Sequence, residues 1–131
     1  MSLTARLDTA RAALAALRDL DGGHATVDSV ARDARLWRFA VAFEALRSAS
    51  RQLLVERYGP SQRTPDGIIR ALRDLGVLDP GAATRLHAAA SFAAGQVEIV
   101  ARDGPHDAAA TIDSHVEALD DLLAALETVA T

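Results

Sequence analysis

The longest regular pattern of apolar positions runs through residues 27–58, a stretch that contains neither proline nor glycine. Its large apolar side chains recur mostly at steps of three, four or seven, which places them on one stripe of a helix. These side chains are Leu36, Phe39, Phe43, Leu46, Leu53 and Leu54. Arginines fill much of the opposite face. A single exposed helix of this length would be unusual, so we expect it to form one wall of a bundle around which the rest of the chain packs.

Two further segments carry apolar residues at alternating steps of three and four, which is the spacing of a heptad seam. The seam of the first predicted helix, residues 4–20, is formed by Leu3, Leu7, Ala10, Leu14 and Leu17. The seam of the last predicted helix, residues 106–129, is formed by Ile112, Val116, Leu119, Leu123 and Leu126. Both helices are therefore expected to bury one face in the bundle.

Capping residues, glycines and prolines mark the remaining boundaries. Thr64-Pro65 combines an N-cap with a proline at the first helical position, which predicts a short helix over residues 65–75 that ends at Gly76. Asp79-Pro80 repeats this signal and predicts a helix over residues 80–101. The other signals are Asp21-Gly22-Gly23, a cap at Thr26 or Asp28, Tyr58-Gly59-Pro60 and Asp103-Gly104-Pro105.

No strand pattern competes with these helices. The sequence therefore predicts an all-α fold, an up-and-down four-helix bundle with one additional short helix, formed by a single domain over residues 1–131. Because much of the apolar half of the composition is alanine, which buries little area, the core is expected to depend on the leucines and on four large aromatic residues, the three phenylalanines and Trp37.

Composition excludes several kinds of chemistry. The chain has no cysteine, so disulfides, thiol catalysis and zinc sites built on sulfur are absent. No apolar run reaches the length of about 18 residues that a membrane span needs. The first residues, MSLTARLDTAR, lack the apolar core of a signal peptide, so we expect a cytoplasmic protein.

All 14 basic residues are arginine, and charge is unevenly distributed. Residues 32–73 carry nine arginines against four acids, whereas residues 103–131 carry seven acids and no arginine. A basic middle segment can meet RNA or an acidic partner. We favour a simpler interpretation, in which the acidic last helix lies beside the arginine-rich helix and the two neutralise each other.

Catalytic and metal-binding patterns are missing. The Glu-x-x-His pairs of a di-metal bundle do not occur, the four histidines form no close pair, and neither a phosphate-binding glycine loop nor Gly-x-Ser-x-Gly is present. We therefore predict no metal and no cofactor. Glu44 is expected to pair with Arg47, Arg51 or Arg38, with a contact to a ligand or partner as the alternative. His87 is expected to be packed or half-exposed.

The residues nevertheless resemble a family. Arg38-Phe39-x-x-x-Phe43-Glu44, then Thr64-Pro65 with an Ile-Ile helix start, then Gly76-Val77-Leu78-Asp79, occur in an order and spacing similar to those of the nucleotidyltransferase substrate-binding proteins, a branch of the HEPN superfamily. The resemblance covers roughly residues 1–128. It implies a five-helix up-and-down bundle that usually forms homodimers and binds a small nucleotidyltransferase subunit. Several such pairs act as toxin and antitoxin, and the HEPN member is then a ribonuclease.

The chain departs from the family where catalysis would lie. The family's fourth helix usually carries Arg-Asn, a His four residues after the Asn and a Tyr two residues later. The aligned positions here are Ser91, Phe92, Gln96 and Glu98. The cation for a phosphate, the imidazole that moves a proton and the tyrosine that partner enzymes modify are therefore all replaced. Phe92 in place of the asparagine suits packing.

Three functions follow from these observations. The leading one is a non-catalytic HEPN-like subunit that binds a small nucleotidyltransferase and contributes to its substrate site. The alternatives are a HEPN ribonuclease with a displaced active site, in which His87 supplies the imidazole, and a homodimeric interaction protein without enzymatic activity. Nucleic acid is a less favoured partner. The predicted interface is the arginine-rich helix with the loop that follows it, and its residues are Arg38, Glu44, Arg47, Arg51, Tyr58 and Arg63.

Overall fold

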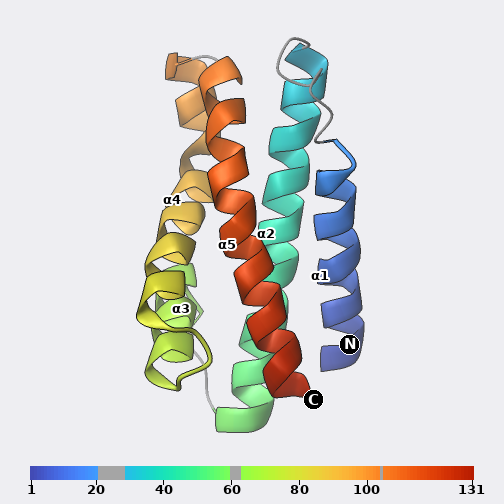
Figure 1. The fold of residues 1–131 in the computed structure, drawn as a ribbon, viewed down its shortest axis with the longest axis vertical. Coiled ribbons are helices and arrows are strands. Elements are labelled where there is room, and N and C mark those ends of the chain that lie inside the picture. Colours follow the sequence, from blue (N-terminus) through green and yellow to red (C-terminus); the bar gives the residue numbers. More distant parts are fainter. Residues whose placement is uncertain (21–28, 60–62, 104) are drawn as a thin grey trace.

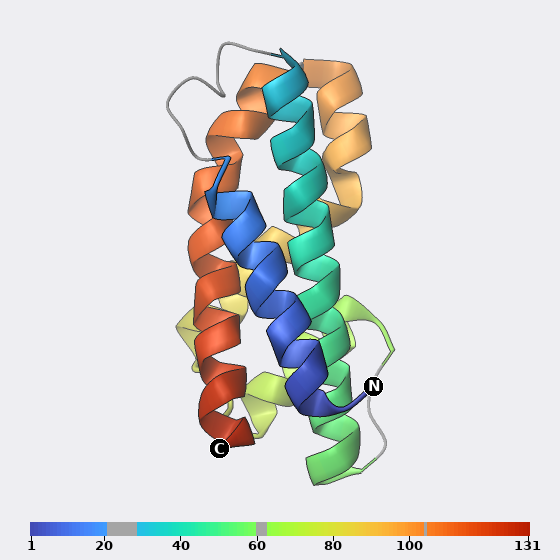
Figure 2. The same cartoon turned by 90° about the vertical axis from the view of Figure 1, so that its right-hand side faces the viewer.

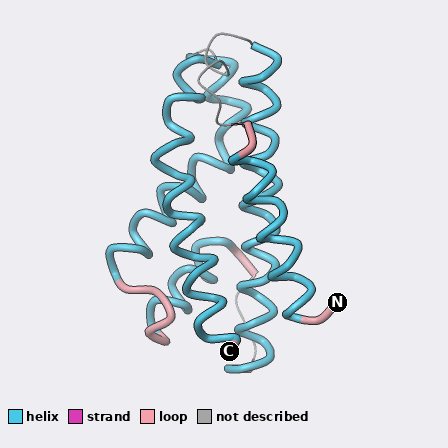
Figure 3. The backbone as a smooth tube through the Cα atoms, turned by 45° about the vertical axis from the view of Figure 1, so that its right-hand side comes forward, coloured by secondary structure: helices cyan, strands magenta, loops and turns pink. Residues whose placement is uncertain are grey.

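The computed structural model of the chain describes residues 1–20, 29–59, 63–103 and 105–131, without the side chains of residues 29–32, 96–103 and 105–111. Within this part the chain is all-α: every regular element is a helix, and no strand occurs (Figure 3). The helices are α1 (Leu3–Arg18), α2 (Ser29–Tyr58), α3 (Pro65–Asp74), α4 (Pro80–Asp103) and α5 (Pro105–Ala130). The predicted fold class is confirmed. Most of the observed helix ends differ from the predicted ones by one or two residues.

The four long helices run alternately up and down (Figure 1). α1 rises from the N-terminus, α2 descends, α4 rises and α5 descends to the C-terminus, while the short α3 lies beside the lower half of α4. α2 contacts each of the other four helices, and α5 contacts α1, α2 and α4. The expectation that α2 is the central member of the bundle is therefore confirmed.

Helix ends follow the predicted signals where the structure describes them. The Oγ atom of Thr64 accepts a hydrogen bond of 3.1 Å from the backbone N–H of Gly67, as an N-cap does. At the other end of α3, Gly76 has a φ of 78°. The N–H groups of Gly76 and Val77 donate to the carbonyls of Arg73 and Leu72, which is the Schellman arrangement. The caps predicted at Thr26 or Asp28, and the break at residues 21–23, lie outside the described residues.

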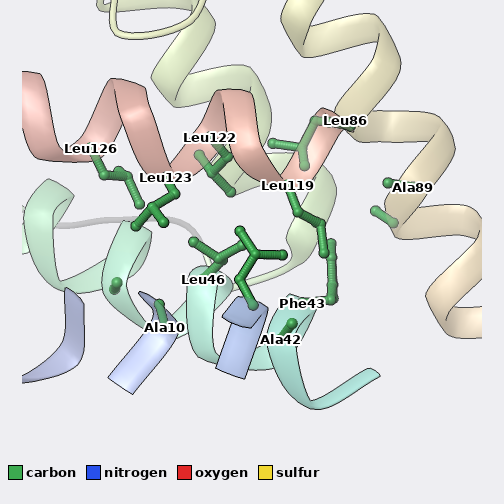
Figure 4. Packing of buried hydrophobic residues seen from close by; sticks show 14 of the residues in the cluster. Ala10, Ala42, Phe43, Leu46, Leu86, Ala89, Leu119, Leu122, Leu123 and Leu126 are labelled. Atoms are coloured by element: carbon green, nitrogen blue, oxygen red, sulfur yellow. The ribbon is translucent and has the colours of Figure 1, made fainter. Parts of the chain in front are cut away.

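The buried residues form one continuous core cluster. It includes the two predicted heptad seams of α1 and α5 and the apolar stripe of α2. Every member of the predicted sets in α1, α2 and α5 is buried. Side chains from three helices come together in this core (Figure 4). α2 contributes Phe43 and Leu46, α5 contributes Leu119 and Leu123, and α4 contributes Leu86. Large-to-small changes here are expected to leave cavities, because protein interiors are close-packed.

One expectation about the core is wrong. Trp37 is not a core residue: 66% of its surface is exposed, whereas the three phenylalanines are buried. The reason is helical phase. Trp37 and Phe39 are two positions apart, about 200° around the helix, so when Phe39 faces the core Trp37 faces away from it.

The charge interpretation is confirmed in part. α5 packs beside α2, and the buried guanidinium of Arg35 pairs with Asp113 across these helices. Other acids of α5 pair with arginines of α1 and α4: Glu127 lies 2.7 Å from Arg11, Asp121 lies 3.3 Å from Arg85, and Asp120 pairs with Arg18. Neutralisation of the acidic helix therefore comes from three helices rather than from α2 alone.

Candidate functional site

Glu44, Arg47 and Arg63 form a polar cluster where α2 passes the start of α3. The Nε atom of Arg47 donates to the Oε2 atom of Glu44 at 3.0 Å, and its Nη2 atom donates to Oε1. The Nη1 atom of Arg47 reaches the backbone carbonyl of Arg63 at 3.5 Å. The arginine thus links α2 to the segment before α3. The predicted pairing of Glu44 with Arg47 is confirmed.

This contact changes the acidity of both groups. The hydrogen bond from Arg47 holds the pKa of the Glu44 carboxyl below its usual value, against a smaller opposing effect of desolvation. The same hydrogen bond raises the pKa of Arg47. Both groups are therefore charged near neutral pH, and the pair presents a fixed carboxylate that is 61% exposed beside a guanidinium that is 28% exposed.

Arg51 and Tyr58 lie further along the exposed side of α2. Arg51 borders an open hollow with Arg6, Ser48 and Val55, and Arg6 of α1 donates hydrogen bonds to the Ser48 hydroxyl and to Gln52. Tyr58 is 46% exposed. These two residues share the outer side of α2 with Glu44.

Arg38 does not join this group. It is exposed, and it lies six residues from Glu44, which is about 120° around the helix. The structure therefore brings Glu44, Arg47 and Arg63 together, leaves Arg51 and Tyr58 on the same side, and separates Arg38 from all of them.

The positions that the resemblance matches to the HEPN catalytic motif divide into two groups. Ser91 is exposed, whereas Phe92 is buried. The ring of Phe92 meets Phe39 edge-on, with centroids 5.3 Å apart, and lies 4.9 Å from the ring of His115. The packing role predicted for Phe92 is confirmed. The side chains of Gln96 and Glu98 lie outside the described residues.

His115 of α5 is a residue that the sequence reasoning did not single out. Its partly buried imidazole lies against Phe39 and Phe92, and burial lowers its pKa from the usual value of 6.5. A signal was present: His115 is three residues after Ile112 and four before Leu119, so it borders the core seam. Two residues earlier, Asp113 holds the buried Arg35.

His87 is the second histidine with a defined partner. Its Nδ1 atom lies 3.1 Å from the Oδ1 atom of Asp66 in the first turn of α3. The His87 side chain is 33% exposed and that of Asp66 is 70% exposed. The prediction of a half-exposed His87 is confirmed, and the pair joins α3 to α4.

A metal site requires a cluster of ligating side chains, and a membrane span requires a long apolar helix. In the part of the chain that the structure describes, no group of three or more His, Asp or Glu side chains has the proximity needed to hold a metal ion. None of the described helices is both long and apolar enough to cross a membrane.

Comparison with known proteins gives a structural relative. No protein-family model matches the chain, and a search of curated proteins gives no match. A crystal structure described as that of ttk003001694 from Thermus thermophilus superimposes with a TM-score of 0.76 at 25% sequence identity. The match covers 89% of this chain and 98% of that chain. The two proteins therefore share the helical-bundle fold over most of this chain, and the name of the Thermus protein states no activity.

Proposed function

We propose that this chain is a non-catalytic HEPN-like subunit that binds a small nucleotidyltransferase and contributes to its substrate site. The observation that supports this proposal most is the position of Phe92. Where the family places a polar asparagine, this chain places a buried ring between Phe39 and His115. The neighbouring Ser91, at the position of the family's arginine, is exposed and carries no charge to bind a phosphate.

The partner would bind at the polar cluster of Glu44, Arg47 and Arg63. Arg47 is held by two hydrogen bonds to the Glu44 carboxylate and one to the Arg63 carbonyl, so little side-chain entropy remains to be lost on binding. The Arg63 side chain, whose backbone carbonyl meets Arg47, is exposed. Arginine forks recognise carboxylates and phosphates in two-point contacts, which suits an acidic partner surface or a nucleotide triphosphate held by the partner.

The test is affinity purification of the full chain from the native lysate at low salt, followed by mass spectrometry. We expect a small nucleotidyltransferase to co-purify with the wild type. Arg63→Glu should abolish recovery of this enzyme. Arg73→Glu, which changes an exposed arginine whose side chain pairs with the neighbouring Asp74, should not. Absence of a nucleotidyltransferase from the wild-type eluate, with the protein still helical by circular dichroism, would count against the proposal.

The pair of His87 and Asp66 favours a second candidate, a HEPN ribonuclease with a displaced active site. A carboxylate at 3.1 Å can orient an imidazole for proton transfer. Incubation with labelled RNA tests this candidate. Cleavage that His87→Ala abolishes would promote it over the non-catalytic subunit, and RNA left intact by the wild type would exclude it.

A further inference from the structure

A hollow between α1 and α2 brings two arginines together. Figure 2 shows the N-terminal half of α1 beside the lower part of α2, and the hollow lies along this contact. Its volume of about 390 Å³ is at the lower end of the range for small-molecule sites, and it is open to solvent on one side. One residue of α1 and five of α2 line it: Arg6, Ser48, Arg51, Gln52, Val55 and Glu56.

The guanidinium of Arg6 is held in a fixed position. Its Nε atom donates to the Oε1 atom of Gln52, and its Nη1 atom donates to the Ser48 hydroxyl. Ser48 and Gln52 are four residues apart, so both lie on the face of α2 that meets α1. Gln52 is fixed in turn, because its Nε2 atom donates at 2.8 Å to the Met1 carbonyl and to the Oε1 atom of Glu56.

The groups that hold Arg6 are neutral, and this sets it apart from comparable arginines. Among the described residues, only Arg6, Arg35 and Arg47 are arginines that are not fully exposed. Arg35 and Arg47 each pair with a carboxylate, as partly buried charges normally do. Within the described part of the chain, neither Arg6 nor Arg51 makes an ion pair. A guanidinium has five N–H donors and Arg6 uses two, so three remain for an anion.

We propose that this hollow is a phosphate site, in which Arg6 and Arg51 bind the phosphate group of a small organic phosphate or free phosphate. Two guanidinium groups balance the charge of a phosphate dianion, and their planar forks make two-point contacts with phosphate oxygens. A phosphate offers more acceptor oxygens than a carboxylate does, which suits donors that come from two helices. Val55 is 50% exposed and provides an apolar wall for an attached organic group.

The phosphate site is distinct from the polar cluster proposed to bind a partner enzyme. Arg47 precedes Ser48 in α2, but its guanidinium bonds Glu44 and the backbone carbonyl of Arg63 before α3. In the described part of the chain, α1 contacts α2 and α5 but not α3. The proposal therefore does not depend on a nucleotidyltransferase, and its test uses the purified chain alone.

Titration at constant ionic strength, followed by NMR spectroscopy at about pH 7.5, where phosphate is a dianion, tests the site. Phenyl phosphate and inorganic phosphate should shift the signals of the Arg6 Nε–H group and the Gln52 side-chain amide, with a Kd of about 1 mM or lower. Phenol lacks the anion, and benzoate presents a carboxylate on the same ring, so both should bind at least about tenfold more weakly. Benzoate that binds as well as phenyl phosphate, or no shift with either phosphate at about 10 mM, would overturn the proposal.

The two phosphates distinguish the source of the anion. Tighter binding of phenyl phosphate would assign the site to organic phosphates, and Val55→Gln should then remove the advantage. Equal binding would assign the site to free phosphate. Single-stranded RNA without a terminal phosphate carries only phosphodiesters, each with one charge, and should compete weakly. If RNA shifted the same signals at a lower concentration than either phosphate, nucleic-acid binding would replace the proposal.

Substitution of the two arginines tests their roles. Arg6→Gln and Arg51→Gln should each weaken phosphate binding about tenfold, as expected when a charge-assisted hydrogen bond is lost. Arg51 is exposed, so its replacement leaves the fold intact even if Arg6→Gln loosens α1. Arg38→Gln is the matched control, since it removes the same charge from an exposed position of α2 outside the hollow. It should change the affinity by less than about twofold.

Glu56→Gln should have the opposite effect. It removes the carboxylate that repels an anion at the hollow and keeps an oxygen that can accept from Gln52. Phosphate affinity should therefore rise about two- to threefold, a gain that partial unfolding cannot imitate. Unchanged affinity in both Arg6→Gln and Arg51→Gln, or weaker binding in Glu56→Gln, would contradict a phosphate site in this hollow.

Discussion

The rings of Phe39 and Phe92 meet edge to face, with their centroids 5.3 Å apart and their planes at 77°. Phe39 comes from the central helix α2 and is fully buried, and Phe92 comes from α4 and is 6% exposed. Such a pair contributes about 0.5–1.5 kcal/mol beyond the burial of its area. The position that aligns with a catalytic asparagine in the resembled family is therefore part of the contact that joins α4 to α2.

The change Phe92→Asn tests this assignment. It removes the ring from a packed site and leaves an amide without a water shell, so we expect the free energy of unfolding to fall by about 3–5 kcal/mol. Urea denaturation followed by circular dichroism measures this loss. Ser91→Asn, at the exposed neighbour, should change stability by less than about 0.5 kcal/mol. A tolerated Phe92→Asn would mean that the site accepts a polar residue and would weaken the non-catalytic assignment.

Phe43 provides a second test of the core. It is 9% exposed and lies beside Ile68, Leu72 and Leu86, where α2, α3 and α4 meet. Phe43→Ala should lower the free energy of unfolding by about 3–5 kcal/mol, because the ring leaves a cavity that three helices cannot close. The comparison is Trp37→Ala, which should cost less than about 1 kcal/mol because the indole is exposed. Similar losses for the two variants would contradict the assigned faces of α2.

Trp37 also shows what could be predicted from the sequence and what could not. The heptad positions of α1 and α5 predicted buried residues correctly because periodicity fixes the phase of a helix. Trp37 was assigned to the core on its size, although its phase relative to Phe39 places it outside. Phase is therefore the stronger signal, and a large apolar residue out of phase with the core is expected to be exposed.

Among the polar contacts, those within one helix could be predicted from the sequence, and those between helices could not. The contact between Glu44 and Arg47 was predictable, because residues three apart lie on one face of a helix. The contacts of Arg47 with the Arg63 carbonyl and of His87 with Asp66 join different elements. They depend on how α3 folds back onto α2 and α4, which local spacing does not determine. His115 was overlooked because it borders its seam rather than occupying it.

The N-cap of α3 is expected to matter for stability. Thr64 accepts a hydrogen bond from the N–H of Gly67 at 3.1 Å, so Thr64→Ala leaves that donor without its partner. We expect a loss of about 1 kcal/mol, measured as a shift of the urea midpoint at constant slope. Thr84→Ala is the matched control. The hydroxyl of Thr84 bonds the carbonyl of Pro80 inside α4, so its removal should be neutral or slightly stabilising.

The final prediction concerns His115 and pH. Burial against Phe39 and Phe92 lowers the pKa of this histidine below 6.5, its ordinary value. As pH falls, the unfolded chain therefore binds a proton at His115 before the folded chain does, and stability must decrease with pH in this window. The contribution of the neutral imidazole is fully present above about pH 6.5 and is lost as pH falls from there through the lower pKa of the folded state.

The measurement is the free energy of unfolding at several values between about pH 8 and pH 5, for the wild type and for His115→Gln. Because every other titrating group is shared, the difference between the two curves isolates the histidine. We expect the wild type to lose more stability than His115→Gln on acidification, so that the curves converge as pH falls. Parallel curves would show that the imidazole protonates equally well in both states, and that its burial against the two rings does not disfavour the charged form.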